Sequence, residues 1–198
     1  MPSKQGLLNA LPAALLAVAL VSCSSPEGGG APSAARSANV DKSVGRNLAT
    51  LDAYCWRIEL NKNTDYSVWA SASGTGIAGA TVQARGTNWA AVLGKAVSDL
   101  KADMKAKGIT PEAAMARQSS RTFSEAEVEM LHNCYQQLDR QAWYVKGTKS
   151  RGWTILCKAD LGQASDVTVF SEGTTLVGTL NEALRKLEGG IAQRAAAR

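Results

Sequence analysis

Apolar and polar residues alternate along two separate stretches of the chain, a period of two that is typical of β-strands. In the first stretch, Trp56, Ile58 and Leu60 share one phase. The alternating runs are residues 56–60, 66–72 and a run around Val82, then 143–145, 153–159 and a run around Val169. The short polar segments 61–65 and 148–152 suit hairpin turns. Each stretch therefore predicts three antiparallel strands.

Apolar residues at helical spacing lie before and after each set of strands. They predict helices near 41–52, 89–100, 124–138 and 176–187. The segment Thr110-Pro111-Glu112 predicts a short connecting helix between the two stretches.

Several residues suit the ends of these helices. Ser124 and Glu127 have the spacing of a capping box. We expect Thr87 and Thr174 to cap the helices that follow the third strands, and Gly189-Gly190 to end the last helix.

The two stretches also align with each other. Residues 48–102 match 135–189 without a gap at an offset of 87, with 12 identities over 55 positions, and the match preserves the apolar phase. Convergent α/β patterning is the alternative to a repeat. The alignment predicts an α+β fold made by internal duplication of an α-β-β-β-α unit. Each unit would hold an antiparallel three-stranded sheet with helices on one face, and the units would pack about a pseudo-twofold axis.

The helices are expected to cover the strand face that carries Trp56 or Trp143. The opposite face is not simply polar, and Cys55 and Arg57 share it with several large apolar residues. Either the two sheets pack on each other through this face, or it receives a ligand, a partner or a second copy of the chain. Its candidate partner-binding residues are Trp69, Tyr144, Leu156 and Phe170.

The pattern of residues at the N-terminus predicts an export signal. One cation, Lys4, precedes an apolar run from 7 to 21 that is too short for an ordinary spanning helix. The residues Leu20-Val21-Ser22-Cys23 resemble the lipobox of bacterial lipoproteins, and a plain secretory signal is the alternative. The resemblance implies cleavage before Cys23 and attachment of acyl chains such as palmitate to it. Two or more chains make a stable membrane anchor.

The predicted boundaries follow from these features. They are a lipoprotein signal peptide at 1–22, a flexible lipid-anchored tether rich in Gly, Ser, Pro and Ala at 23–39, a first repeat at 40–108, a connector at 109–122 and a second repeat at 123–198. Cleavage would remove one of the 22 cations, so that 21 cations and 17 anions leave a net charge of +4. The cations are scattered, which favours an ordinary solvated surface.

Three cysteines remain besides Cys23, and an oxidising compartment permits one disulfide among them. Cys134 lies on the inner face of its predicted helix and Cys157 on the inner face of its predicted strand, so Cys134–Cys157 is the expected pair. Cys55–Cys134 is the alternative. The cysteine spacings and the single histidine of the chain match no common zinc pattern, so we expect neither a metal nor a cofactor.

No group of residues predicts catalysis. His132 and Cys134 are two positions apart and so point about 200° apart on a helix, which favours a surface histidine beside a structural cysteine. Asp52 and Asp139 are the acidic residues that the repeats share, and each suits a helix end or turn. Two further shared residues, Lys62 and Lys149, are expected in solvated turns, and the glycines of 74–79 in a loose loop.

Two further resemblances are confined to short patterns. The helix-strand-strand-strand-helix order resembles that of double-stranded RNA-binding domains, but Asn88-Trp89-Ala90-Ala91 stands where those domains carry a lysine cluster. Residues 173–176 with 182–184 resemble the strand-to-helix junction of HicB-type antitoxins. Neither resemblance contributes a functional residue, and we expect no nucleic-acid partner.

The expected function is that of a non-enzymatic binding or scaffolding lipoprotein of the bacterial envelope. In a Gram-negative host, Ser24 after Cys23 favours the outer membrane on its periplasmic side. The expected partner is an envelope protein or an anionic wall polymer, with a second copy of the chain as a further candidate. The alternatives are an inhibitor or immunity lipoprotein against an envelope-targeting enzyme, and a small envelope hydrolase.

Overall fold

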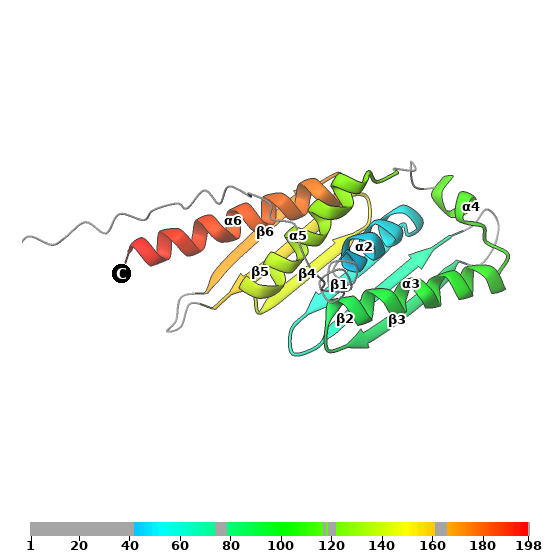
Figure 1. Ribbon diagram of the computed structural model, residues 1–198, viewed down its shortest axis with the longest axis horizontal. Helices are drawn as coiled ribbons and strands as arrows, with labels where there is room; N and C mark the ends of the chain where they lie inside the picture. The colour runs from blue at the N-terminus through cyan, green and yellow to red at the C-terminus, as the bar shows by residue number, and fades with distance from the viewer. Residues whose placement is uncertain (1–41, 74–78, 117, 119–121, 161–165, 198) are drawn as a thin grey trace, which may run out of the picture. The chain divides into compact units, whose positions relative to one another are not determined.

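Six antiparallel strands form one continuous sheet in a computed structural model that describes residues 42–73, 79–116, 118, 122–160 and 166–197 (Figure 1). The strands are β1 Arg57–Lys62, β2 Tyr66–Ala72, β3 Ala80–Gly86, β4 Tyr144–Lys149, β5 Trp153–Ala159 and β6 Val167–Gly173. Their order across the sheet is β3-β2-β1-β4-β5-β6. The alternation of the sequence thus predicted all six strands.

The two expected three-stranded sheets are not separate. β1 pairs with β4 along their length, and the register places Leu60 opposite Gly147. Neither sheet therefore packs face to face on the other, which corrects one of the two arrangements expected from the sequence. The physical reason is that β1 and β4 would each leave a row of unpaired backbone groups at an edge, and pairing them satisfies both rows.

The helices of the described residues lie over one face of the sheet (Figure 1). They are α2 Ser43–Tyr54, α3 Trp89–Ala106, α4 Pro111–Ala116, α5 Glu125–Gln141 and α6 Leu176–Ala196. α3 packs on β2 and β3, α6 packs on β5 and β6, and α2 and α5 pack against each other between them. The chain is thus a mixed α/β protein with one helical layer on an antiparallel sheet.

The core lies between the helices and the sheet. Alternate strand residues such as Ile58, Leu60 and Ile155, and helix leucines such as Leu93 and Leu180, all have at most 1% exposed area. Full burial of one such side chain contributes about 1.5–3 kcal/mol. The apolar residues at helical spacing in the sequence therefore form the side of the core that the helices contribute.

The predicted N-cap of α5 is confirmed, whereas the N-caps of α3 and α6 differ from the prediction by one residue. Ser124 and Glu127 form the expected capping box at α5. The caps of α3 and α6 are Asn88 and Thr175, one residue after the expected Thr87 and Thr174.

The glycines 189 and 190 do not end α6, which runs on to Ala196. Glycine inside a helix is unfavourable by about 1 kcal/mol but does not stop the helix. A Cβ at Gly190 would meet Val167 Cγ1 at 2.6 Å, so the missing side chain lets α6 pass close to β6.

Some expectations fall on residues outside the described ranges. These are the lipobox with Cys23, the tether to residue 39 and most of the glycine loop at 74–79. Within the described ranges, no helix combines the length and apolarity needed to cross a bilayer.

Candidate functional site

The sheet face opposite the helices is covered by no described element, and we call it the open face. Every second strand residue points to it, as the exposed positions 81, 83 and 85 of β3 illustrate. A sheet face in contact with water normally carries polar residues. The open face departs from this at its aromatic and aliphatic residues, so it is the candidate functional site.

All four expected partner-binding residues lie on the open face, but they form two groups. Leu156 in β5 stands directly opposite Phe170 in β6, and Tyr144 begins the neighbouring strand β4. Phe170 keeps 51% of its surface exposed. Trp69 lies in β2, separated from this group by β1. The second half of the sheet therefore carries three of the four expected residues.

Each group of aromatic residues has a cation over it. The Arg57 guanidinium lies 5.1 Å from the centre of the Trp69 ring. The Lys158 ammonium lies 5.6 Å from the ring of Tyr144 and 5.9 Å from that of Trp143. An exposed cation–aromatic contact is worth about 0.5–1 kcal/mol. The open face thus presents aromatic surfaces beside cations, and one of these cations, Arg57, is also paired with Glu59 at 2.9 Å.

Three residues lie elsewhere than expected. Trp56 and Trp143 are 43% and 42% exposed, and each lies between the end of a helix and the start of a strand. Cys55 is fully buried and is not on the open face, because α2 continues to Tyr54 and makes Cys55 its C-cap.

Lys62 and Lys149 are not solvated turn lysines. Lys62 ends β1, and its ammonium lies 2.8 Å from a carboxylate oxygen of Asp139 in α5. Lys149 ends β4 and lies 2.7 Å from a carboxylate oxygen of Asp52 in α2. We call these two contacts the crossed ion pairs, because each joins a strand of one half of the chain to a helix of the other.

Each lysine also caps the helix that it reaches. Lys62 donates hydrogen bonds to the backbone carbonyls of Asp139 and Ala142, and Lys149 donates one to the carbonyl of Asp52. Cations are favourable at the C-terminal end of a helix, where carbonyl groups lack partners. A lysine from the opposite half therefore offsets the partial negative charge at the C-terminal end of each of these two helices.

The carboxylates of the crossed ion pairs have second partners. The Tyr66 hydroxyl donates to Asp139 at 3.0 Å, and Trp153 Nε1 donates to Asp52 at 2.9 Å. Burial and the hydrogen bond to Asp139 raise the pKa of Tyr66 to about 12. Asp52 and Asp139 are thus held by groups of the same chain, as structural residues are.

The crossed ion pairs are what sequence reasoning missed. A signal was available, since both lysines and both aspartates recur at the offset of 87. Residue types that are present at equivalent positions of both halves can form equivalent contacts. Here each lysine contacts the aspartate of the other half.

The cysteines beyond the N-terminal segment are buried and free. Cys55, Cys134 and Cys157 each occur as thiols, so the structure does not contain the expected Cys134–Cys157 disulfide. Burial is the main cause that raises the pKa of Cys55 and of Cys157 to about 12, and it also raises that of Cys134.

His132 is buried rather than on the surface, with 7% of its area exposed. It lies where α5 crosses α2 at Gly45, and a Cβ at Gly45 would lie 3.1 Å from His132 Cβ. Among the described residues, no group of histidines, cysteines and carboxylates is arranged to hold a metal ion.

One hollow of about 430 Å³ contains a crossed ion pair. Asp52, Lys149, Arg151 and Trp153 contribute to its lining. The polar atoms of Asp52, Lys149 and Trp153 bind one another there, so the hollow does not present a set of converging free groups of the kind that proton transfer requires. The open face is therefore the stronger candidate.

Comparisons of the chain with protein-family models, curated proteins and solved structures found no match.

Proposed function

We propose that the chain is a lipid-anchored protein of the bacterial envelope that binds a protein partner through the open face, without a catalytic step of its own. The observation that carries the proposal is the exposure of Phe170 beside Leu156 on a face that no described element covers. Protein interfaces are enriched in aromatic residues and arginine, and their hot spots are enriched in Trp, Tyr and Arg. The open face offers Trp69, Tyr144 and Arg57 for this purpose.

The anchor belongs to the same proposal. The lipobox-like segment before Cys23 supports acylation of that cysteine, and the residues up to 39 would form the tether. Growth with labelled palmitate tests the anchor directly. The full chain should carry the label, and a Cys23→Ala variant should not.

Crosslinking in cells tests the open face. A photoreactive amino acid at position 170 of the lipidated chain should yield one dominant adduct with an envelope protein. The matched control carries the same group at Asn181, an exposed position of α6 in the helical layer, and should not yield that adduct. Equal adducts from both positions, or none from position 170, would overturn the proposal.

The identity of the adduct separates the other candidate functions. Wall fragments alone would mean that the open face binds an anionic polymer instead of a protein. A dimer of the chain alone would mean that the face joins two copies. An envelope enzyme whose activity falls on binding would make the protein an inhibitor, which is one form of the proposed function.

We further propose that the two halves of the chain arose by duplication of one α-β-β-β-α unit. The sheet register supports this, because Leu60 and Gly147, which pair at the junction of β1 and β4, are themselves 87 positions apart. The reciprocal contacts of the crossed ion pairs support it as well.

A further inference from the structure

A second hollow, of about 370 Å³, lies in the helical layer where α3 ends and the chain turns into α4. Its lining comes from Tyr54, Lys101, Met104, Lys105 and residues 108–111. Met104 and Ile109 are only 2% and 4% exposed, so they form its floor. This hollow is on the opposite side of the sheet from the open face.

The turn beside this hollow is held by hydrogen bonds. Gly108 adopts a φ of 65°, a conformation that favours glycine at the end of a helix. The Ile109 N–H donates to the Met104 carbonyl at 2.9 Å, and the Ala113 N–H donates to Thr110 Oγ1 at 3.2 Å as α4 begins. The hollow is therefore preformed, since its walls are fixed by contacts within the chain.

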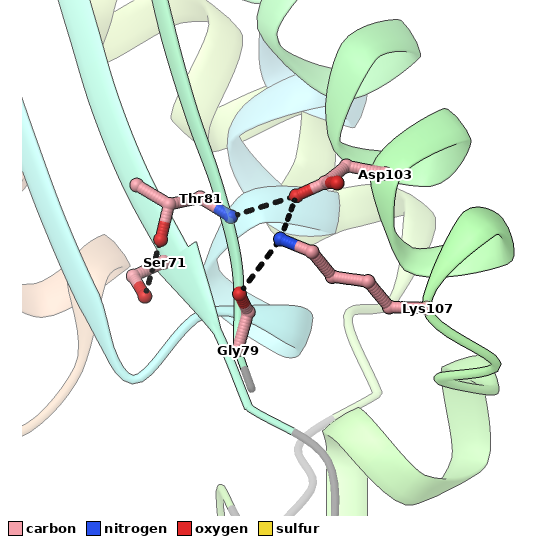
Figure 2. Close-up of polar contacts among 5 residues, drawn as sticks. All are labelled: Ser71, Gly79, Thr81, Asp103 and Lys107. Atoms are coloured by element: carbon pink, nitrogen blue, oxygen red, sulfur yellow. Dashed lines mark hydrogen bonds and ion pairs between the residues drawn. The ribbon is translucent and has the colours of Figure 1, made fainter. Parts of the chain in front are cut away.

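Some charges at this end of α3 are already neutralised. Lys107 lies 2.9 Å from Asp103 and donates to the Gly79 carbonyl at 3.1 Å, and Asp103 accepts from the Thr81 N–H at 3.0 Å (Figure 2). The hydrogen bond from Lys107 is the main cause that lowers the pKa of Asp103. Figure 2 shows these contacts attaching α3 to the start of β3, where Thr81 also meets Ser71.

Lys101 and Lys105 are different. They are one helical turn apart on α3, both are exposed, and neither forms an ion pair within the described part of the chain. Two ammonium groups thus stand beside an apolar floor. Apolar pockets with a few well-placed polar groups are typical of small-molecule sites, and 370 Å³ falls in their usual size range.

We propose that this hollow binds a free fatty acid, with the acyl chain on Met104 and Ile109 and the carboxylate between Lys101 and Lys105. At roughly 30 Å³ for each water-sized group, the volume holds about a dozen such groups, close to the size of a ten-carbon acid. A free fatty acid brings one acyl chain and one anionic group, which match the single hollow and the single pair of lysines. This site is independent of the partner site on the open face.

Methyl-labelled NMR of the full chain carrying Cys23→Ala tests the site directly. Sodium decanoate, below the concentration at which it forms micelles, should shift the Met104 and Ile109 methyl signals saturably, with a Kd below about 1 mM. The Ile58 and Ile155 methyls lie in the core away from the hollow and should not move. Shifts that miss Met104 and Ile109, or that do not saturate, would overturn the proposal.

Charge is tested by changing the ligand and the lysines. Decyltrimethylammonium has the same chain with the opposite charge and should bind at least 10-fold more weakly than decanoate. The variant Lys101→Gln/Lys105→Gln should lose about 10-fold in decanoate affinity, because it removes both cations that would contact the carboxylate. The variant should still fold, because both positions are exposed. The control Lys146→Gln, on the open face, should leave the affinity unchanged. Equal binding of both amphiphiles would show that the lysines do not select the ligand.

Discussion

The ammonium of Lys62, at the end of β1, lies 2.8 Å from the carboxylate of Asp139, which is 77 residues later in the chain. Its counterpart, Lys149, contacts Asp52 at 2.7 Å in the opposite sense. The two halves of the sheet are therefore joined by more than the β1–β4 ladder, because each half supplies the cation that completes a helix of the other.

Replacing Lys62 with Met should destabilise the fold by about 2–3 kcal/mol. The lysine side chain is 11% exposed, and its loss leaves the Asp139 carboxylate without its cation and the carbonyl of Ala142 without its lysine donor, although the Tyr66 hydroxyl still donates to Asp139. Urea unfolding measures the change. The control Lys95→Met removes an exposed pair with Asp99 and should cost less than about 0.5 kcal/mol. Equal losses from both variants would contradict the structural role of Lys62.

The two aspartates of the crossed ion pairs should contribute differently to the free energy of unfolding. The side chain of Asp52 is 12% exposed and that of Asp139 is 34% exposed. Asp52→Ala also leaves the indole N–H of the buried Trp153 without its acceptor, whereas the hydroxyl of Tyr66 can turn to water. We expect losses of about 3 kcal/mol for Asp52→Ala and about 2 kcal/mol for Asp139→Ala in the same assay. The reverse order would contradict this reasoning.

Alkaline pH should destabilise the protein. Folding raises the pKa of Cys55, Cys157 and Tyr66 to about 12, above their ordinary values of 9 to 10. The unfolded chain therefore releases these protons first, and the free energy of unfolding should fall as pH rises from about 9 toward 12. Unfolding curves across this range measure the slope. A Cys55→Ser/Cys157→Ser variant should have a shallower slope, and a flat wild-type profile would contradict the prediction.

Thiol labelling should distinguish the free cysteines of the structure from the disulfide that the sequence suggests. In a Cys23→Ala chain at pH 8, the buried thiols should react slowly while the protein is folded. After unfolding without a reductant, Cys55, Cys134 and Cys157 should all react. If only Cys55 reacts, the Cys134–Cys157 bond has formed in the purified protein.

Gly147→Leu should weaken the junction between the halves. A Cβ at this position would lie 3.2 Å from Ile155 Cδ1 and 3.4 Å from Leu60 Cδ1. The added side chain overpacks this region, at a loss of about 1–3 kcal/mol. Adding Leu60→Ala should recover part of the stability, because it vacates the space that the new leucine needs. An additive double variant would show that the two side chains do not compete.

Local sequence pattern predicts the elements well because each depends on nearby residues. The strands follow from alternation, and the α5 cap follows from Ser124 and Glu127. Strand phase alone is enough to place Leu156 and Phe170 on the same side of the sheet, but it also puts Cys55 there, which the structure places at the end of α2.

Long-range contacts lie beyond that reasoning. Nothing local to β1 or β4 says that these two edges join, because every edge strand presents the same unpaired backbone groups. The sequence places Lys62 and Lys149 in turns because a polar residue at the end of a strand usually faces water. It places Trp56 on the helix-covered face because strand phase ignores where a strand begins.

Gly147 and Gly45 each contact the residue that is aligned with them in the other half of the chain. Gly147 faces Leu60, and Gly45 faces His132, and in both cases the neighbour is the residue 87 positions away. At such a point, a unit that met an identical copy of itself would place two large side chains, or two glycines, in one space. The chain instead sets a large residue against a glycine, with the glycine once in the first half and once in the second. The two halves are therefore complementary in shape at these two points. A protein built from two copies of either half would have a steric clash at one point and a void at the other.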